Sequence, residues 1–474
     1  MMRASQPVLS PGVLVRSRRA LLAVGLLGAL VGPMLPGFAA VPVVQSTVVR
    51  RTLGAAAHTD AGVVAALAAD TLLVGVTWPA GAAEVDVRWR IPGGWTPWAA
   101  AETEPGTAPG GDGDAGVRPG TEPLWPVRGA TAVGVRLRSV TSPSPPQLLM
   151  VGERTSRTWQ VGGTANALAA TTTGEERLGR VVSRLEWGAD ESLRKRATYQ
   201  SRVDAVVVHH TVNANDYTET EAPSIVRSIY AFHVRGRGYD DIAYNLLVDR
   251  FGRVFEGRAG GFRDRAIKGS HTGGFNQGTL GVAMIGQTDE AAPAPALADA
   301  VARVAAWAAD RWGFDPRRQT TLTSKGSSRY PNGRRVTVPR LLGHRDLSNT
   351  ACPGRFAYPM LPDLRERAWH LLAPVITDVV VEGAPVRSPE PLRIRARLTA
   401  PAAWTITVTA PYGEVVSSSE GIGVAPALEW DGRVGGLPAL PGEYTWSATA
   451  DDGVHGASAP ATGTVLVGPP ALGI

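Results

Sequence analysis

The spacing of hydrophobic and polar residues divides the chain into three regions. Residues 41–157 show short apolar or β-branched runs between turn-forming residues, which is typical of a β-rich domain. Residues 178–373 alternate strand-like runs with helical patterns, which predicts an α/β domain. Residues 374–470 return to short, evenly spaced strand patterns, which favours an Ig-like β-sandwich. Residues 158–177 are rich in Gly, Ala and Thr and are expected to be a linker.

The N-terminal region is expected to hold strands joined by one long loop. The predicted strands are 71–78, 85–91 and 130–140. Residues 102–123 are mostly Gly, Pro, Thr and acidic residues, so we expect an exposed loop there. Trp89, Trp95 and Trp98 favour a sandwich core, with a sugar-stacking surface as the alternative.

The central region carries the clearest mixed pattern. Its predicted strands are 203–208, 242–248, 254–257 and 280–285. Its predicted helices are 222–234, with one apolar stripe, and 296–312, which should end at Gly313. In the C-terminal region the predicted strands are 392–398, 404–409 and 444–450.

The first 39 residues have the pattern of an export signal. Arg3, Arg16, Arg18 and Arg19 precede an apolar run, 20–31, that is too short to span a bilayer. We expect cleavage near Ala39, with the twin-arginine and general secretion routes both open and an uncleaved anchor as the alternative. The mature protein is then expected to be secreted, extracytoplasmic and associated with the cell wall, without a transmembrane anchor.

Most of the net positive charge of the chain lies in this N-terminal segment. The sequence has 48 Lys and Arg against 42 Asp and Glu, a net charge of +6, which invites a nucleic-acid partner. Residues 1–39 hold four arginines and no acid, so the remainder has 44 basic and 42 acidic side chains and a net charge of +2. No basic stripe accompanies that charge, so we expect no nucleic-acid binding.

The single cysteine of the chain lies near candidate metal-binding histidines. Cys352 follows His344 by eight residues across a turn-rich segment, so both side chains can face one point. One more imidazole would complete a set of two nitrogens and one sulfur, which leaves the fourth tetrahedral position of a catalytic zinc open. His209 and His210 follow a predicted strand, where neighbouring side chains point to opposite faces, so only one of them can join. The pattern does not choose between them.

Seven segments in order give the central region a family resemblance. They are residues 182–189, 207–211 (Val-Val-His-His-Thr), 241–245, 256–258, 271–276, 281–286 and 343–346 (Gly-His-Arg-Asp). The region resembles the peptidoglycan recognition protein family, which includes type-2 N-acetylmuramoyl-L-alanine amidases. The resemblance implies a central mixed sheet flanked by helices and one zinc ion. In the C-terminal region, residues 429–432 and 441–444 resemble the Ig-like module of flagellar hook-capping proteins.

The resemblance assigns residues to the metal and to catalysis. The family ligands correspond to His209, His344 and Cys352, and the catalytic tyrosine corresponds to Tyr244. Thr350 stands two residues before the cysteine, where active members carry Lys or Thr. Non-catalytic members replace the cysteine by serine, and this chain retains it, so the resemblance implies an enzyme.

The implied reaction is hydrolysis of the amide between N-acetylmuramic acid and L-alanine in peptidoglycan. Tyr244 is expected to donate to the developing oxyanion, with Thr350 as a second polar contact. Asn245, Arg258, His271 and Arg345 are candidate contacts for peptidoglycan or muropeptides, with structural hydrogen bonds and ion pairs as the alternative for each. The proton acceptor stays unassigned.

Two other functions are compatible with parts of the pattern. A non-catalytic peptidoglycan-binding protein would share the fold, although it would need no open metal site. A surface adhesion protein would account for the two β-rich flanks. We expect a monomer.

Overall fold

The computed structural model describes residues 43–107, 111–156, 175–260, 266–386, 391–458 and 460–469. The expected export signal, 1–39, lies outside these residues, as does most of the predicted linker, whose last residues form a short helix, η2 (Glu175–Leu178). Within the described residues there is no helix with both the length and the apolar character that a bilayer crossing requires.

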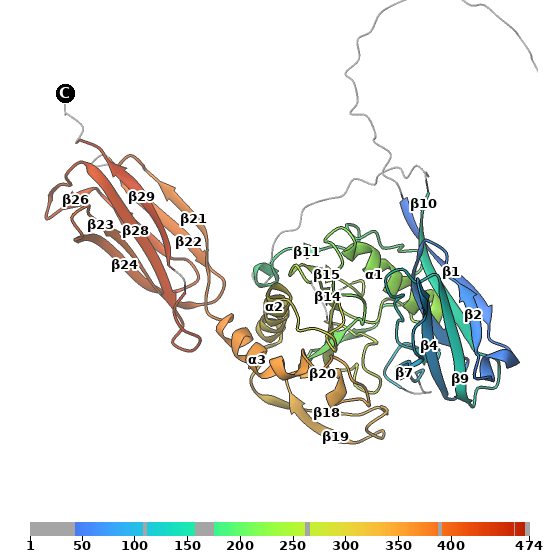
Figure 1. Ribbon diagram of the computed structural model, residues 1–474. Helices are drawn as coiled ribbons and strands as arrows, with labels where there is room; N and C mark the ends of the chain where they lie inside the picture. The colour runs from blue at the N-terminus through green and yellow to red at the C-terminus, as the bar shows by residue number, and fades with distance from the viewer. Residues whose placement is uncertain are drawn as a thin grey trace, which may run out of the picture. The chain divides into compact units, whose positions relative to one another are not determined.

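The N-terminal region contains two antiparallel sheets, as its sequence pattern indicates (Figure 1). One sheet has the order β1 (Val43–Thr52), β10 (Gln147–Ser156), β3 (Thr71–Thr77), β8 (Gly120–Thr121) and β7 (Thr103–Glu104). The other has the order β2 (Val63–Ala66), β9 (Ala132–Val140), β4 (Ala83–Ile91) and β5 (Gly94–Trp95), with β6 (Ala99–Ala100) paired to β4; a short helix, η1 (Ala55–His58), precedes β2. Their facing side chains form one core, which includes Trp89, whereas Trp95 and Trp98 lie against the Arg88 guanidinium.

The expectation of an exposed loop at 102–123 is wrong for the residues of this segment that the structure describes, 102–107 and 111–123. The segment contains β7 and β8, and Asp112 and Asp114 are only 8% and 6% exposed. These carboxylates bind groups of the central region. Because these groups are far away in the sequence, the local sequence of the segment does not predict the contacts.

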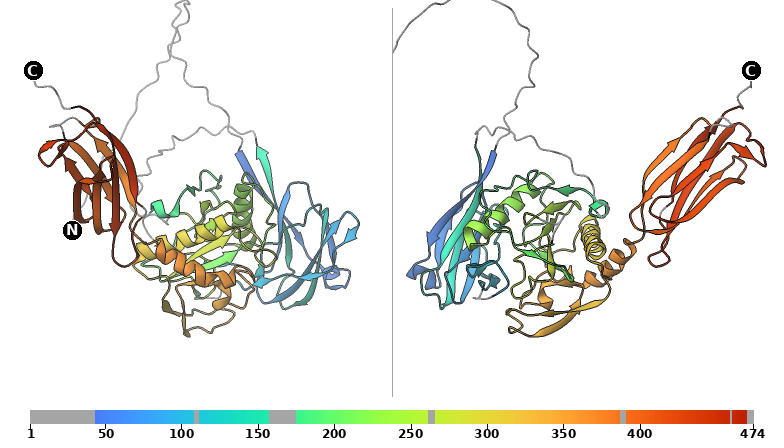
Figure 2. Two further views of the ribbon diagram at one scale, coloured as in Figure 1. Left: turned by 60° about the vertical axis from the view of Figure 1, so that its left-hand side comes forward. Right: turned by 180° about the vertical axis from the view of Figure 1, so that it is seen from behind.

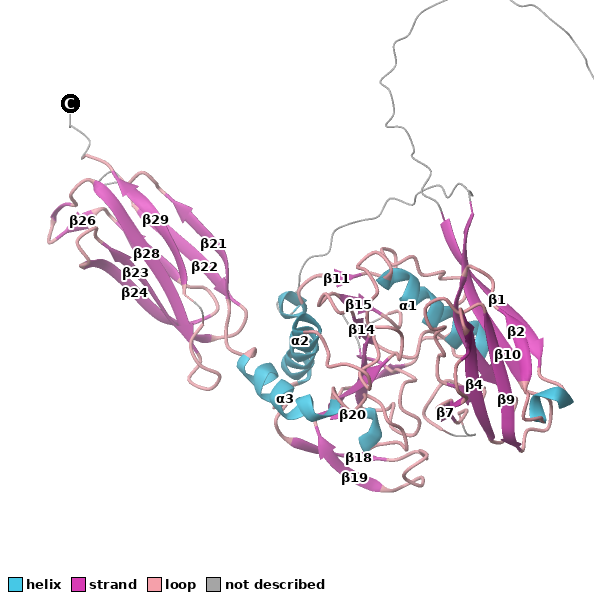
Figure 3. Cartoon of the chain, viewed as in Figure 1, coloured by secondary structure: helices cyan, strands magenta, loops and turns pink. Residues whose placement is uncertain are grey.

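The central region has a six-stranded mixed sheet (Figure 3). Its order is β11 (Val181–Val182), β15 (Val254–Glu256), β14 (Leu246–Val248), β17 (Thr279–Met284), β13 (Ala205–His210) and β20 (Leu341–Gly343). Only the β14–β15 pair is antiparallel. All six residues of β13 are buried, as expected for an inner parallel strand. Two small ribbons complete the strands: β12 (Tyr199–Gln200) with β16 (Ala266–Ile267), and β18 (Gln319–Thr323) with β19 (Arg335–Pro339).

Helices cover this sheet (Figure 2). α2 (Pro295–Trp312) buries mostly alanines, which allow a close approach to the strands, and ends at Gly313 with φ 67°, as predicted. α3 (Leu361–His370) joins the same core, after the single turns η4 (His344–Asp346) and η5 (Tyr358–Met360). α1 (Ala222–Ala231) continues into a π-helical turn, η3 (Phe232–Arg237), which the sequence pattern did not predict.

The N-terminal sheet and α1 share one hydrophobic core. Leu73 and Leu149 of the sheet cluster with Ile229 and Phe232 of the central region. A Cβ atom at Gly75 of β3 would lie 2.3 Å from the Phe232 ring, so the absence of a side chain there lets the ring approach the strand. The two regions are therefore packed like parts of one domain.

The C-terminal region has two antiparallel sheets around its own core. One contains β21 (Ile376–Glu382), β22 (Leu392–Leu398) and β25 (Ala427–Trp430). The other has the order β24 (Val415–Gly423), β23 (Ala402–Thr409), β28 (Gly442–Asp451) and β29 (Ala461–Val467), and β26 (Arg433–Val434) pairs with β27 (Leu437–Pro438). The three strands predicted here correspond to β22, β23 and β28.

Candidate functional site

Two adjacent parallel strands bring the first pair of histidines together. β13 and β20 pair so that Val208 lies opposite Gly343. The next residues of the two chains, His209 and His344, therefore lie side by side, with ring centroids 4.6 Å apart. Because both strands run in the same direction, their carboxyl ends lie side by side, and two histidines more than 130 residues apart in the sequence come into contact there.

Cys352 reaches the same point on a loop that folds back over η4. The Arg345 amide donates to the Cys352 carbonyl at 2.9 Å, which closes this loop. Gly343 makes room for it, since a Cβ atom there would lie 2.7 Å from Pro353 and 2.9 Å from the Tyr358 ring. The structure thus selects His209 from the His209–His210 pair. The His210 ring instead lies 2.9 Å from the Thr288 hydroxyl.

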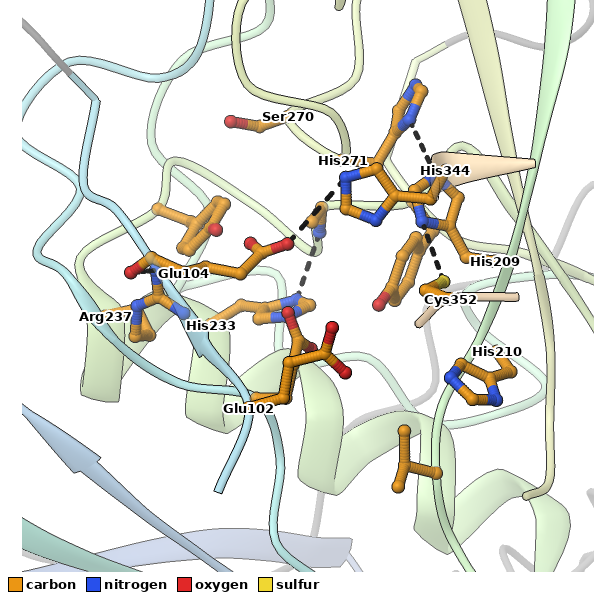
Figure 4. A pocket seen from close by; sticks show the side chains of 15 residues that line it. Glu102, Glu104, His209, His210, His233, Arg237, Ser270, His271, His344 and Cys352 are labelled. Atoms are coloured by element: carbon orange, nitrogen blue, oxygen red, sulfur yellow. Dashed lines mark hydrogen bonds and ion pairs between the residues drawn. The ribbon is translucent and has the colours of Figure 1, made fainter. Parts of the chain in front are cut away.

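The three side chains fit a zinc ion. One ligand atom from each of His209, His344 and Cys352 lies within 4.8 Å of the others, and all three side chains are buried (Figure 4). Nδ1 of His209 is 3.7 Å from Sγ of Cys352. Tetrahedral zinc with ordinary bond lengths holds a nitrogen and a sulfur about 3.6 Å apart. Two imidazoles and one thiolate leave a fourth position open, which is typical of catalytic rather than structural zinc.

His271 orients the His209 ring. Nε2 of His209 lies 3.0 Å from Nδ1 of His271, and Nδ1 of His271 is also 3.0 Å from the Thr272 hydroxyl. When the Nε2–H of His209 donates to His271, Nδ1 of His209 is left bare and faces Cys352. Gly281 admits the His271 ring, because a Cβ atom there would lie 2.4 Å from it.

Burial sets the protonation of the three ligands. It lowers the pKa values of His209 and His344, so both imidazoles are neutral at physiological pH, the form that binds a metal. It raises the pKa of the Cys352 thiol, so a metal ion must displace the thiol proton when it binds.

Comparison with protein families agrees with this geometry. Residues 199–355 match the family described as N-acetylmuramoyl-L-alanine amidase, and residues 39–162 match the one described as Rv3811 N-terminal galactose-binding domain-like. The chain carries an N-acetylmuramoyl-L-alanine amidase domain. The buried His209–His344–Cys352 triad is consistent with the single zinc ion of that domain.

The similar proteins each match only part of this chain. Peptidoglycan-recognition protein 1 of Holotrichia diomphalia is 34% identical over 131 residues, 28% of this chain and 64% of that protein. Peptidoglycan recognition protein 4 of Homo sapiens is 28% identical over 173 residues, 36% of this chain and 42% of that protein. Among solved structures, Drosophila PGRP-LB has 26% identity, covers 38% of this chain and 92% of its own, and has a TM-score of 0.31. The chain thus spans less than two thirds of the length of these two curated relatives.

Tyr244 and Thr350 differ in their freedom to contact a ligand. Tyr244 lines the metal pocket, and no hydrogen bond to its hydroxyl is found among the described residues. Burial raises its pKa, so the hydroxyl stays a donor at neutral pH. The Thr350 hydroxyl donates to Glu102 and accepts from the Cys352 amide at 3.1 Å. Since a hydroxyl has a single proton, the Thr350 hydroxyl cannot donate to another group while it donates to Glu102.

The four predicted substrate contacts have structural partners within the chain. The Asn245 amide donates to the Ile267 carbonyl, and its oxygen accepts from the Gly281 amide. Arg258 is 2% exposed and forms an ion pair with Asp114. Arg345 donates to the Ala351 carbonyl and stacks on Tyr358. Of the four residues, only His271 lines the metal pocket. Contacts of Asn245, Arg258 and Arg345 with the substrate stay predictions.

Two cavities meet at the metal site, and the sequence pattern does not predict several of the residues that line them. The metal pocket has a cavity volume of about 20 Å³, and the adjoining groove has about 540 Å³. Both are lined by Glu102, Glu104, Tyr239, Ser270 and His344. The two glutamates belong to the N-terminal region and have no motif around them, so only the folded chain brings them here.

Proposed function

We propose that this chain is a zinc-dependent N-acetylmuramoyl-L-alanine amidase that hydrolyses the amide between the lactyl group of N-acetylmuramic acid and L-alanine in peptidoglycan. The observation that carries the proposal is the triad itself. Cys352 stands beside His209 and His344 and completes a buried N₂S ligand set with an open fourth position. A protein that only binds the wall would gain nothing from such a site.

Residues of this chain can supply the remaining parts of the reaction. Zinc at the triad would supply Lewis-acid polarisation of the amide carbonyl and activation of water. Tyr244, which lines the same pocket with its hydroxyl protonated, would donate a hydrogen bond to the oxygen that becomes negative. His271 would keep the His209 ring in place throughout.

The groove beside the metal pocket is the proposed binding site for the glycan and the stem peptide. Its walls come from the N-terminal region, including Gly106 and Thr107, and from the amidase domain, including Ser327 and Asn349. Its cavity volume of about 540 Å³ lies within the range of ~300–1,000 Å³ that is usual for ligand sites, so the groove can hold a fragment of a glycan or of a stem peptide.

A product analysis tests the proposal. The zinc-loaded chain is incubated with purified muropeptides and with wall sacculi, and the products are identified by mass. We expect separate glycan and stem peptide, with a new free amine on L-alanine, and no release by the Cys352→Ser variant. Zinc binding without release of peptide would instead favour a peptidoglycan-binding protein.

We infer that residues 1–39 direct export and are removed, which places the protein outside the cytoplasmic membrane and at the cell wall. The basic start and the short apolar run of that segment support this inference. Sequencing the N-terminus of the protein recovered from culture medium and wall fractions tests it.

We propose that the flanking regions position the amidase domain on the cell wall. We also propose that the protein is a monomer. The C-terminal region is proposed to be an Ig-like module similar to that of flagellar hook-capping proteins; its two facing sheets support the Ig-like part. Removal of residues 374–474 should weaken binding to sacculi while cleavage of soluble muropeptides continues.

A further inference from the structure

The acidic side chains around the metal pocket all come from outside the amidase domain. Among the described residues that line this pocket, the carboxylates are those of Glu102, Glu104 and Glu122. All three lie in the segment that joins β6 to β9 in the N-terminal region. The metal site therefore lies close to the N-terminal region of the chain.

Two aspartates fix this segment to the amidase domain. Asp112 accepts hydrogen bonds from the backbone amides of Gly274, Asn276 and Gln277 at 2.6–3.0 Å. Asp114 pairs with Arg258 and also accepts from the Asp240 amide at 3.0 Å. Because these carboxylates are at least nine-tenths buried, their partners must stay in place for the fold to be stable.

Glu102 holds the loop that presents Cys352. Its carboxylate accepts the Thr350 hydroxyl and the Ala351 amide, the latter at 2.9 Å. The Thr350 hydroxyl in turn accepts from the Cys352 amide at 3.1 Å. A carboxylate of the N-terminal region thus fixes the backbone immediately before a metal ligand.

Glu104 faces another ligand of the metal. Its Oε1 atom lies 3.9 Å from Nε2 of His344. A dashed line marks this contact in Figure 4. At this distance the contact is electrostatic rather than a direct hydrogen bond, and the charge of a carboxylate behind a ligating imidazole raises the basicity of the ring. Glu102 and Glu104 are two residues apart on and beside β7, so their side chains project to the same face.

We propose that the N-terminal region forms the second half of the zinc site, with Glu102 and Glu104 as positioning residues for Cys352 and His344. Zinc binding and docking of the 102–122 segment then stabilise each other, since each requires the same arrangement of ligands. The amidase domain without this segment would have all three ligands, yet it would hold them less firmly.

The test measures zinc affinity in the full chain by competition with a chromophoric chelator. We expect Glu104→Gln and Glu102→Ala each to weaken zinc binding by about 10–100-fold. Glu102→Gln keeps an oxygen acceptor for Thr350 and Ala351 and should retain most of the affinity. Asp60→Asn, an exposed acid of the same region, is the matched control and should bind zinc like the unmodified chain.

Two further measurements separate this proposal from a general loss of structure. The visible absorption of the Co²⁺-substituted chain should change in Glu104→Gln, because the geometry around His344 changes. In the unmodified chain, zinc should slow amide hydrogen exchange within 102–122. Unchanged zinc affinity in Glu104→Gln, tighter binding, or exchange that does not respond to zinc would each overturn the proposal. None of these measurements requires hydrolysis, so their outcome is independent of the proposed amidase activity.

Discussion

Asp114 of the N-terminal region and Arg258 of the amidase domain form a buried ion pair. Nη1 of Arg258 lies 2.9 Å from Oδ1 of Asp114, Nη2 bonds the other carboxylate oxygen, and the two side chains are 4% and 2% exposed. The guanidinium presents its planar fork to both oxygens, the geometry in which an arginine binds a carboxylate most firmly. The pair therefore locks the acidic segment against the domain that binds the metal.

We predict that Asp114→Ala destabilises the chain by about 3–5 kcal/mol, because it leaves the Arg258 charge buried without a partner. The free energy of unfolding in urea is the measurement. A double variant, Asp114→Leu with Arg258→Met, removes both charges and should recover a large part of this loss.

The exposed pair of Arg128 and Asp216 supplies the control. Their atoms are 3.9 Å apart and their side chains are 95% and 69% exposed, so Asp216→Ala should have little effect on unfolding. If Asp114→Ala were as stable as Asp216→Ala, the Asp114–Arg258 pair would not hold the two regions together.

A second prediction concerns the ligands. His344→Ala and Cys352→Ser should each abolish hydrolysis, since either change leaves two protein ligands for zinc. Both variants should stay folded, because the sheet and helices around the site do not depend on these side chains for their core. Activity assays with circular dichroism as the folding control check this, and a retained rate in either variant would refute the zinc assignment.

Much of the fold follows from local patterns in the sequence. β13 is a β-branched run, and α2 has a helical period with a glycine at its end, so both were predicted from spacing alone. The pairing of His344 with Cys352 followed from a short separation in sequence. The choice of His209 over His210 came from the family resemblance and not from spacing, because it depends on the register in which β13 pairs with β20.

The sequence could not reveal the partners of the acidic segment. Its composition of Gly, Pro, Thr and acids is the same whether it is exposed to solvent or docked, and its buried aspartates bond groups more than 120 residues away. The sequence makes Arg258 a candidate contact for peptidoglycan, whereas in the structure its guanidinium binds the carboxylate of Asp114. Long-range pairing of this kind is a property of the folded chain.

A third prediction concerns Tyr244. Its replacement by phenylalanine keeps the ring beside His209 and removes only the hydroxyl that lines the pocket. We expect turnover to fall by about 10²–10³-fold, the usual effect of losing one donor to an oxyanion, with zinc affinity unchanged. Steady-state kinetics on a soluble muropeptide, with a chelator competition as the control, make the measurement. Normal turnover would remove Tyr244 from the mechanism.

A fourth prediction concerns acid stability and His233. Burial lowers the pKa of this ring to about 3, and its Nδ1 atom accepts the Ala243 amide at 3.1 Å. In the unfolded chain the ring takes up a proton near pH ~6.5, whereas in the folded chain it stays neutral down to about pH 3. Its contribution to stability is therefore complete above pH ~6.5 and falls by about 1.4 kcal/mol for each pH unit below that.

His233→Asn keeps an acceptor for the Ala243 amide and cannot take up this proton. The loss of unfolding free energy between pH 7.5 and pH 5 should then be about 2 kcal/mol smaller in this variant than in the unmodified chain. Denaturant unfolding followed by the helical circular dichroism signal reports on the central region, 178–373, since α1, α2 and α3 all lie there. His58→Asn, at an exposed position, should leave the pH dependence unchanged. Equal pH dependence in His233→Asn and the unmodified chain would mean that the buried ring is not kept neutral by the fold.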